Sequence, residues 1–250
     1  MNKIRDVGAY FERVWKASGM RMENVRMMWA SDEINAAPDT YWNLVMQLAM
    51  KTSISRVKRC GTIMGRSEGD DQPAAQVMYP LMQAADIFFL GADICQLGMD
   101  QRKVNMLARE FADKANLDKP IIVSHHMLAG LTGEKMSKSD PNSAIFMEDS
   151  TEDITRKIKG AFCEPENIEK NPVLEYCRYV IYESGVTILG FETYQELEDA
   201  YASGAVHPSE LKPPVAEAID ALIEPVRSHF QNDPVARDLF KRVQSYRVTK

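Results

Sequence analysis

Hydrophobic residues recur with helical spacing over most of this chain. The apolar positions between Ile4 and Trp15 share one helical face, which ends at Gly19. The same spacing predicts a long helix from Asp39 to about Arg59. After residue 149 it predicts a succession of helices, over residues 151–162, 171–183, 194–202, 215–230 and 234–246. The C-terminal part of the chain is therefore expected to be all helical.

Three short apolar runs lack helical spacing and predict strands, at residues 25–30, 92–97 and 121–124. The last two are typical of buried strands, and they flank residues 101–117, where the apolar residues have helical spacing. A strand, a helix and a strand in this order imply a crossover and a parallel sheet. Ligands bind beyond the carboxyl ends of such strands, where residues 98–101 and 135–139 fall.

A polar stripe is predicted on the helix that contains Tyr79, Gln83 and Asp86. Pro80 suits the first turn of a helix, where its missing N–H has no cost. The three polar residues are spaced by four and then three positions, so they project from one face. A solvated face of an amphipathic helix is the plainer interpretation. The apolar run over residues 87–90 favours a binding role instead, because it indicates a buried helix.

The segment that starts at Gly98 combines backbone freedom with polar side chains at a helix start. Glycine permits close approach of a ligand to the backbone, and a helix N-terminus offers free N–H groups to an anion. Asp100 suits the hydroxyl pair of a ribose, and Gln101 suits a carboxylate or an amino group. Taken alone, Asp100 is more often a helix cap than a ligand.

Residues 135–139, called the lysine loop below, read Lys-Met-Ser-Lys-Ser. Two lysines with serine hydroxyls between and beside them suit phosphate oxygens, and such a loop can neutralise a departing pyrophosphate. The plainer alternative is a solvated basic turn. Arg156, Lys157 and Lys159 form a second short basic patch, on the predicted helix over residues 151–162.

Composition limits the class of protein. With 250 residues, 45% hydrophobic and 26% charged, the chain can form two domains. Its net charge of −6 and pI near 5.4 argue against an entirely basic surface, although a local basic stripe would suffice for RNA. No apolar run approaches the length of a membrane span and no signal peptide is evident, so we expect a cytoplasmic protein without a membrane role.

The lysine loop resembles the second signature of class I aminoacyl-tRNA synthetases. With residues 79–103, 125–140, 161–165 and 207–212, the whole chain resembles tyrosyl-tRNA synthetases of the archaeal and eukaryotic cytoplasmic type. The resemblance implies an α/β fold, in which a partial Rossmann-like parallel-sheet catalytic domain is followed by an all-helical anticodon-binding domain. Residues 1–149 would be the C-terminal part of the catalytic domain with the lysine loop, and residues 150–250 the anticodon-binding domain.

The resemblance also implies a role for each candidate residue. Tyr79 and Gln83 would hold the amino group of L-tyrosine, Asp86 its phenolic hydroxyl, and Gln101 would lie near its carboxylate. ATP would be bound by Gly98, Asp100, Met136, Ser137 and Ser139, and Lys135 and Lys138 would act in catalysis on its β- and γ-phosphates. Phe191, His207 and Glu210 would contact the anticodon of tRNA(Tyr). Without the family, His207 is better explained as a residue near the helix N-cap before Pro208.

The implied reaction is the ATP-dependent activation of tyrosine followed by its transfer to tRNA(Tyr). Mg²⁺ would accompany ATP, and no metal site made by the protein is visible in the sequence. We expect a homodimer, or a pseudo-dimer with a complementary half. The prediction for discrimination against phenylalanine is a factor of roughly 10⁴–10⁵, because a site built for a hydroxyl leaves polar groups unpaired when the hydroxyl is missing.

One departure from the family concerns its first signature, His-x-Gly-His. The four histidines are His125, His126, His207 and His229, and none of them forms this motif. The resemblance therefore implies that the N-terminal part of the catalytic domain is lacking, which leaves activity of this chain alone in doubt. Two alternatives stay open. One is a tryptophanyl-tRNA synthetase, and the other is a non-catalytic fragment that binds tRNA or a partner.

Overall fold

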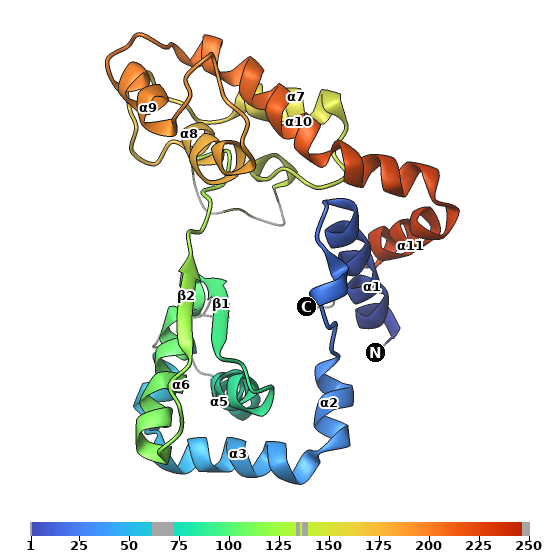
Figure 1. Ribbon diagram of the computed structural model, residues 1–250, viewed down its shortest axis with the longest axis vertical. Helices are drawn as coiled ribbons and strands as arrows, with labels where there is room; N and C mark the ends of the chain where they lie inside the picture. The colour runs from blue at the N-terminus through green and yellow to red at the C-terminus, as the bar shows by residue number, and fades with distance from the viewer. Residues whose placement is uncertain (1, 62–72, 134–135, 137–139, 247–250) are drawn as a thin grey trace. The chain divides into compact units, whose positions relative to one another are not determined.

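The computed structural model describes residues 2–61, 73–133, 136 and 140–246 (Figure 1). The chain forms two compact units. Residues 28–127 make the first, called the central unit, and residues 1–27 together with 128–250 make the second, called the helical unit. Residues 128–149 and the first helix thus belong with the C-terminal helices. The functional division into residues 1–149 and 150–250 stays a prediction.

The central unit is a small α/β structure. Its elements are α2 (Ala30–Ala36), α3 (Pro38–Lys51), α4 (Ile54–Lys58), α5 (Ala74–Phe89), β1 (Ile94–Gly98), η3 (Met99–Gln101), α6 (Arg102–Ala115) and β2 (Ile121–His125). The two strands are parallel, with Ile94 opposite Ile121 and Gly98 opposite His125. This confirms the predicted parallel sheet with a crossover helix.

The core of the central unit lies between α3, α5 and α6. The predicted apolar face of α6 is buried, as Val104, Leu107 and Phe111 show. It packs with α3 and α5, which contribute Tyr41 and Leu81 among others. Burial of large apolar side chains stabilises such a core by about 1.5–3 kcal/mol for each residue.

Two expectations about local structure in the first sixty residues are wrong. Residues 25–29 form no strand, and α2 begins at Ala30. Val25, Met27 and Met28 are exposed, so the apolar run is not buried in any sheet. The long helix also stops at Lys51, because Ser53 is the N-cap of a separate helix, α4, and its hydroxyl accepts a hydrogen bond from the Arg56 amide.

Two further expectations about the central unit need correction. Pro80 lies inside α5, which begins at Ala74, and not in its first turn. The strands are not fully buried either, because exposed and half-buried residues alternate along them. Cys95 on the half-buried side faces Asn105 of α6, whereas Ile94 and Ile121 are exposed. One face of the sheet is therefore covered much more than the other.

The helical unit confirms the predicted succession of helices. Its elements are α1 (Asn2–Ala17), η1 (Met22–Asn24), η4 (Pro141–Ser143), α7 (Thr151–Gly160), α8 (Pro172–Tyr176), η5 (Cys177–Ile181), η6 (Tyr182–Ser184), α9 (Tyr194–Ala202), α10 (Pro208–Asn232) and α11 (Pro234–Ser245). The predicted helix over residues 171–183 is α8 continued by a π-helical turn, η5, and a 3₁₀ turn, η6. It ends at Gly185, whose φ of 81° favours glycine.

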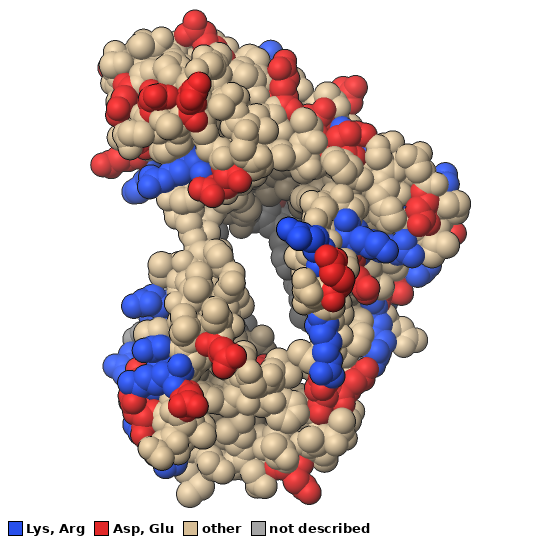
Figure 2. Space-filling view, in the orientation of Figure 1, with Lys and Arg blue, Asp and Glu red and all other residues tan. Residues whose placement is uncertain are grey.

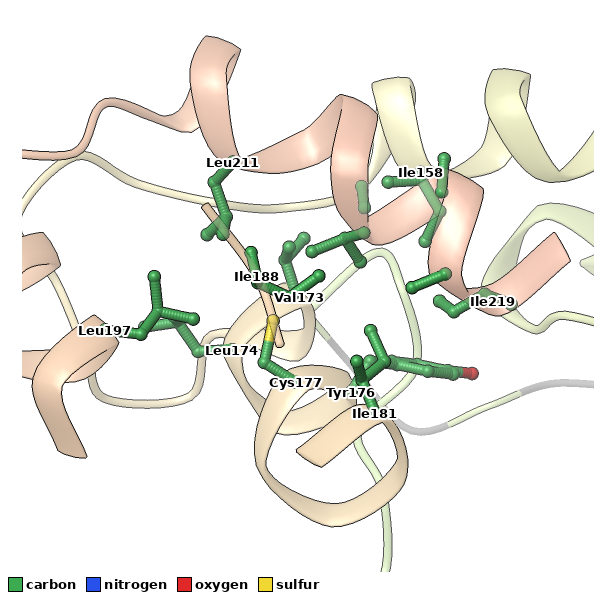
Figure 3. Close-up of a cluster of buried hydrophobic side chains, with 14 of the residues drawn as sticks. Ile158, Val173, Leu174, Tyr176, Cys177, Ile181, Ile188, Leu197, Leu211 and Ile219 are labelled. Atoms are coloured by element: carbon green, nitrogen blue, oxygen red, sulfur yellow. The ribbon is translucent and has the colours of Figure 1, made fainter. Parts of the chain in front are cut away.

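The core of the helical unit lies between α7, α8, α9 and α10 (Figure 3). Ile158 of α7, Leu174 of α8, Leu197 of α9 and Leu211 of α10 are buried there. Each residue comes from the apolar stripe of its own helix, so the helices pack through the faces that their periodicity predicts.

The predicted basic patch on α7 is wrong in one member. The Lys157 side chain is only 3% exposed, and its Nζ atom lies 2.5 Å from Oδ2 of Asp149. The same ammonium donates to the carbonyl of Ala144 and lies over the ring of Phe146. Lys157 is therefore a buried structural cation and not part of a surface patch.

Candidate functional site

Helix α5 presents the three predicted polar residues on one face. Tyr79 is 49% exposed, whereas Gln83 and Asp86 are half-buried. The surrounding positions Leu81, Ala84 and Ala85 are buried in the core of the central unit. The polar face is therefore carried by a helix that is fixed by its apolar face, which is a rigid support for a binding site.

Two of the predicted residues are joined by a hydrogen bond between separate elements. Nε2 of Gln83 donates to Oε1 of Gln101, over 2.9 Å. Nε2 of Gln101 in turn donates to Oδ2 of Asp100, over 3.0 Å. The turn η3, which follows β1, and helix α5 thus contribute to one polar network. Because each side chain in the network restrains the next, the network keeps their polar atoms in a defined arrangement.

Asp86 has a partner that the sequence does not predict. The hydroxyl of Tyr41, on α3, donates to Oδ1 of Asp86 over 3.0 Å. Burial raises the pKa of Asp86, and the hydrogen bond from Tyr41 partly opposes that rise. Burial and the neighbouring carboxylate raise the pKa of Tyr41 well above its usual range, so the phenol stays protonated and remains a donor.

Gly98 lies at the carboxyl end of β1, where there is no room for a side chain. A Cβ atom here would lie 2.6 Å from Sδ of Met127 and 2.7 Å from Oδ1 of Asp100. Asp100 itself lies in η3, directly before α6. Glycine at position 98 therefore lets the Asp100 carboxylate lie against the end of the strand, as expected of a site where a ligand approaches the backbone.

The lysine loop is only partly described. Lys135, Ser137, Lys138 and Ser139 lie outside the described residues, and Met136 is exposed. On either side of the loop, the amide of Leu131 donates to the carbonyl of Ser143 over 2.9 Å. The carbonyl of Leu131 accepts from the Phe162 amide over 2.7 Å. The base of the loop is thus held to the helical unit.

The predicted anticodon residues His207 and Glu210 have a local structural role. His207 is the N-cap of α10, and its Nδ1 accepts from the amide of Ser209 over 3.2 Å. Oε2 of Glu210 accepts from the amide of His207 over 3.0 Å. This reciprocal cap is the plainer explanation of His207, and it keeps both side chains exposed at one helix end.

Phe191 differs from these two residues in its surroundings. It is half-buried and packs against the core of the helical unit. Its carbonyl accepts from the hydroxyl of Tyr182 over 3.0 Å. The contact of Phe191 with a nucleotide base stays a prediction.

Charge is unevenly distributed over the helical unit. Figure 2 shows Asp and Glu side chains gathered over α9. Glu196, Glu198 and Asp199 lie on this helix. A polyanion would be repelled from that surface, so an RNA-binding surface is expected away from the exposed side of α9.

The described residues also limit what else the molecule can bind. They contain no group of three or more His, Cys, Asp or Glu side chains that could hold a metal ion. Within the same part of the chain, no helix combines the length and the apolar character that crossing a membrane requires.

Sequence reasoning missed Tyr41, because it occupies a core position of α3 and nothing in its own segment indicates a polar partner. Its contact with Asp86 joins residues 45 positions apart. Together, the described site offers a half-buried carboxylate, an amide network and a carboxylate beside a glycine. Such groups can bind hydroxyl, amino and ribose groups, and none of them is a typical nucleophile.

Comparisons with a family model and with known proteins point to the same family. Residues 1–224 match the family model of class I tRNA synthetases (W and Y). The chain is similar to the cytoplasmic tyrosine–tRNA ligase 1 of Arabidopsis thaliana, with 51% identity over 264 residues that cover 100% of this chain and 69% of the relative.

Solved structures agree with that comparison. The chain resembles the Leishmania major tyrosyl-tRNA synthetase in complex with tyrosinol, with a TM-score of 0.92 and 49% identity over 98% of this chain, but it spans only 40% of that longer chain. A tryptophanyl-tRNA synthetase from Aeropyrum pernix has a TM-score of 0.67 and 20% identity, covering 92% of this chain and 64% of that one, which shows the common fold alone.

Proposed function

The chain belongs to the class I tyrosyl-tRNA synthetases, which confirms the predicted family and fold class, and we propose that it takes part in activating tyrosine with ATP and in transferring it to tRNA(Tyr). The observation that carries the proposal is the polar face of α5. It combines the half-buried carboxylate of Asp86 with the amide of Gln83, which donates a hydrogen bond to the Gln101 amide of η3.

Tyrosine binding follows from the chemistry of this face. Tyr79 and Gln83 bind the amino group of the substrate, and Gln101 lies near its carboxylate. Asp86 accepts a hydrogen bond from the phenolic hydroxyl. Phenylalanine lacks this hydroxyl and leaves one oxygen of the half-buried Asp86 carboxylate without the substrate donor, which is the basis for rejecting it by about 10⁴–10⁵. An indole N–H would have to reach the same acceptor from a larger ring, so Asp86 favours tyrosine over tryptophan.

ATP binding is assigned to the end of β1 and to the lysine loop. Asp100, beside the side-chain-free position Gly98, suits the ribose hydroxyls. Met136, Ser137 and Ser139 contact the nucleotide, and Lys135 and Lys138 neutralise the β- and γ-phosphates. The described residues supply no cluster for a metal ion, so Mg²⁺ would be held mainly by the phosphates of ATP and would add positive charge there.

The proposed chemistry needs no covalent intermediate on the protein. The tyrosine carboxylate attacks the α-phosphorus in line, a carboxylate–phosphorus bond forms, and the bond to pyrophosphate breaks. A hydroxyl of the terminal ribose of tRNA then attacks the carbonyl carbon of the adenylate. An ester bond forms as the hydroxyl loses its proton, and the bond between the carbonyl carbon and AMP breaks. The protein contributes by holding the reactants in this geometry and by neutralising the pyrophosphate as it leaves.

Recognition of tRNA(Tyr) is assigned to the helical unit. The cap at the start of α10 exposes His207 and Glu210 at one helix end, and Phe191 lies in the loop before α9. Side chains that are fixed by a cap and remain exposed are suited to reading a base edge by hydrogen bonds. This supports the proposed contact with the anticodon.

A homodimer is proposed as the assembly. Trp42, Met46 and Met50 follow one another at four-residue spacing on α3, and all three are exposed. Met50 is 86% exposed. A continuous apolar ridge of this kind on a helix is typical of a surface that pairs with another protein surface.

The name of the Arabidopsis relative supports a cytoplasmic location.

Tyrosine-dependent ATP–pyrophosphate exchange by this chain tests the proposed activity, with tryptophan as the control substrate. Exchange with tyrosine and not with tryptophan is expected. Exchange with tryptophan would contradict the choice of substrate. No exchange in a sample shown to be folded by circular dichroism would contradict activation by this chain alone, and would favour a non-catalytic fragment.

Two variants test the residue assignments in the same assay. Asp86→Ala is expected to reduce the preference for tyrosine over phenylalanine by at least about 100-fold, because the acceptor of the phenol is removed. Lys138→Ala is expected to slow activation with less effect on tyrosine binding. Asp118→Ala and Lys58→Ala are the matched controls, since both change exposed residues of the central unit outside the proposed site. Unchanged discrimination in Asp86→Ala would contradict the assignment of Asp86.

A further inference from the structure

Tyr41 is a buried polar group that the proposed function does not yet use. Tyr41 is 1% exposed, and its ring packs edge to face against Phe89 of α5, with the ring centroids 5.1 Å apart. The hydroxyl of a buried tyrosine requires a hydrogen-bond partner, and here the partner is Oδ1 of Asp86, at 3.0 Å. Helices α3 and α5 pack directly on each other, so both ends of this contact are held by the core.

The contact occupies Oδ1 of Asp86 and leaves the other carboxylate oxygen, Oδ2, available to a second donor. Among the described residues, no donor to Oδ2 of Asp86 is present. An ionised carboxylate has acceptor sites on both oxygens, and its terminal torsion is broad unless a partner fixes it. Apart from burial, the hydrogen bond from Tyr41 is what shifts the pKa of Asp86, and no cation of the described residues contributes to the shift. The free oxygen therefore suits a neutral hydroxyl donor.

We propose that Tyr41 is a positioning residue for selection of the substrate phenol. Its hydroxyl holds the Asp86 carboxylate through Oδ1, in an orientation that leaves Oδ2 for the hydroxyl of tyrosine. This inference rests on the proposed function, because it takes Asp86 as the acceptor of the substrate hydroxyl. Tyr41 acts through Asp86 and need not touch the substrate.

The variant Tyr41→Phe separates the hydrogen bond from the packing, because it keeps the ring and removes only the hydroxyl. The preference for tyrosine over phenylalanine, measured as the ratio of their dissociation constants by equilibrium dialysis, is expected to fall about tenfold. Phenylalanine binding is expected to change little. Tyr194→Phe is the matched control, because Tyr194 also donates to a carboxylate, Glu198, but lies in the helical unit.

A double-mutant cycle distinguishes positioning from a general effect on folding. If Tyr41 acts through the ionised Asp86 carboxylate, Tyr41→Phe lowers the preference in the wild-type chain and has little further effect in an Asp86→Asn background. An equal loss in both backgrounds would overturn the proposal, because it would show that Tyr41 acts independently of Asp86.

A measurement without substrate keeps this inference separate from the proposed function. The Asp86 carboxyl titration, followed by carbon-13 NMR in the whole chain, is expected to move to higher pH in Tyr41→Phe, since a hydrogen bond that favours the charged form is lost. An unchanged titration would overturn the inference whether or not the chain binds tyrosine.

If Asp86→Ala abolishes the preference for tyrosine while Tyr41→Phe leaves it intact, the inference fails and the proposed function stands. If Asp86→Ala has no effect on the preference, the assignment under the proposed function fails.

Discussion

Asp86 shows, at the scale of a single residue, how binding chemistry conflicts with stability. Burial raises the pKa of its carboxyl group, so the folded state binds the proton more readily than the unfolded state does. The resulting contribution to stability is complete below the ordinary pKa of the group and is lost as pH rises through the raised value. At neutral pH the ionised carboxylate therefore costs folding free energy. A half-buried residue that lowers stability and retains a free acceptor is typical of a functional position.

The variant Asp86→Asn tests this directly. It removes the titration and keeps a side chain of the same shape. The unfolding free energy of the variant relative to that of the wild type is therefore expected to increase as the pH rises from acid to neutral. Urea unfolding at a series of pH values measures the difference between the two proteins. A difference that does not change with pH would contradict the raised pKa of Asp86.

At the scale of elements, the end of β1 and the start of α6 form the ATP side of the proposed site. The strand ends at Gly98, the 3₁₀ turn η3 carries Asp100, and α6 follows at Arg102. The parallel register with β2 brings Gly98 opposite His125. The position of the Asp100 carboxylate therefore depends on the absence of a side chain at residue 98.

Gly98→Ala is expected to weaken ATP binding while tyrosine binding changes little. The added methyl group would lie within 3 Å of Oδ1 of Asp100 and must displace it. The KM for ATP in pyrophosphate exchange is expected to rise about tenfold, since misplacing a binding group costs on the order of 1–2 kcal/mol. Gly160→Ala is the control, because nothing lies within 4 Å of a Cβ atom there. An unchanged KM would argue against Asp100 as a ribose ligand.

The segment between the lysine loop and α7 depends on a second element-scale contact, the buried pair of Lys157 and Asp149. Asp149→Ala would leave the Lys157 ammonium buried without its carboxylate. The loss in unfolding free energy is expected to be about 3–5 kcal/mol, measured by urea denaturation. By comparison, Arg156→Ala breaks an exposed pair with Asp153 and should cost less than about 1 kcal/mol. Equal effects of the two substitutions would contradict the structural role of Lys157.

At the scale of the whole molecule, the chain forms two units that each have their own apolar core. The central unit carries the described part of the proposed tyrosine site, and the helical unit carries the candidate anticodon residues. A further apolar surface, on α3, is not buried by either core. Its exposure is the feature that a dimer would explain.

The double substitution Met46→Lys and Met50→Lys is therefore expected to convert a dimer to a monomer in sedimentation equilibrium. Two lysines on the apolar ridge would have to be desolvated in any dimer that buries it. Lys16→Met, on an exposed position of α1, is a control that leaves the ridge intact. A wild-type chain that is monomeric at high concentration would contradict the proposed homodimer.

The sequence was sufficient for features that depend on local spacing. The helices of the C-terminal part, the parallel arrangement around α6 and the common face of Tyr79, Gln83 and Asp86 were all predicted correctly. Each follows from a periodicity within about fifteen residues, and such a pattern identifies both an element and its buried side. The family and its fold class were also recognisable, because several separated motifs agree in order.

Features that depend on contacts between distant segments required the tertiary structure. Residues 25–29 have the composition of a strand but pair with no strand in the described part of the chain. Lys157 belongs to a basic patch in the sequence but is buried beside Asp149. The contact of Tyr41 with Asp86 links two helices whose sequences contain no signal for it. The partner of a polar side chain is determined by how other elements pack around it, and the local sequence does not specify that packing.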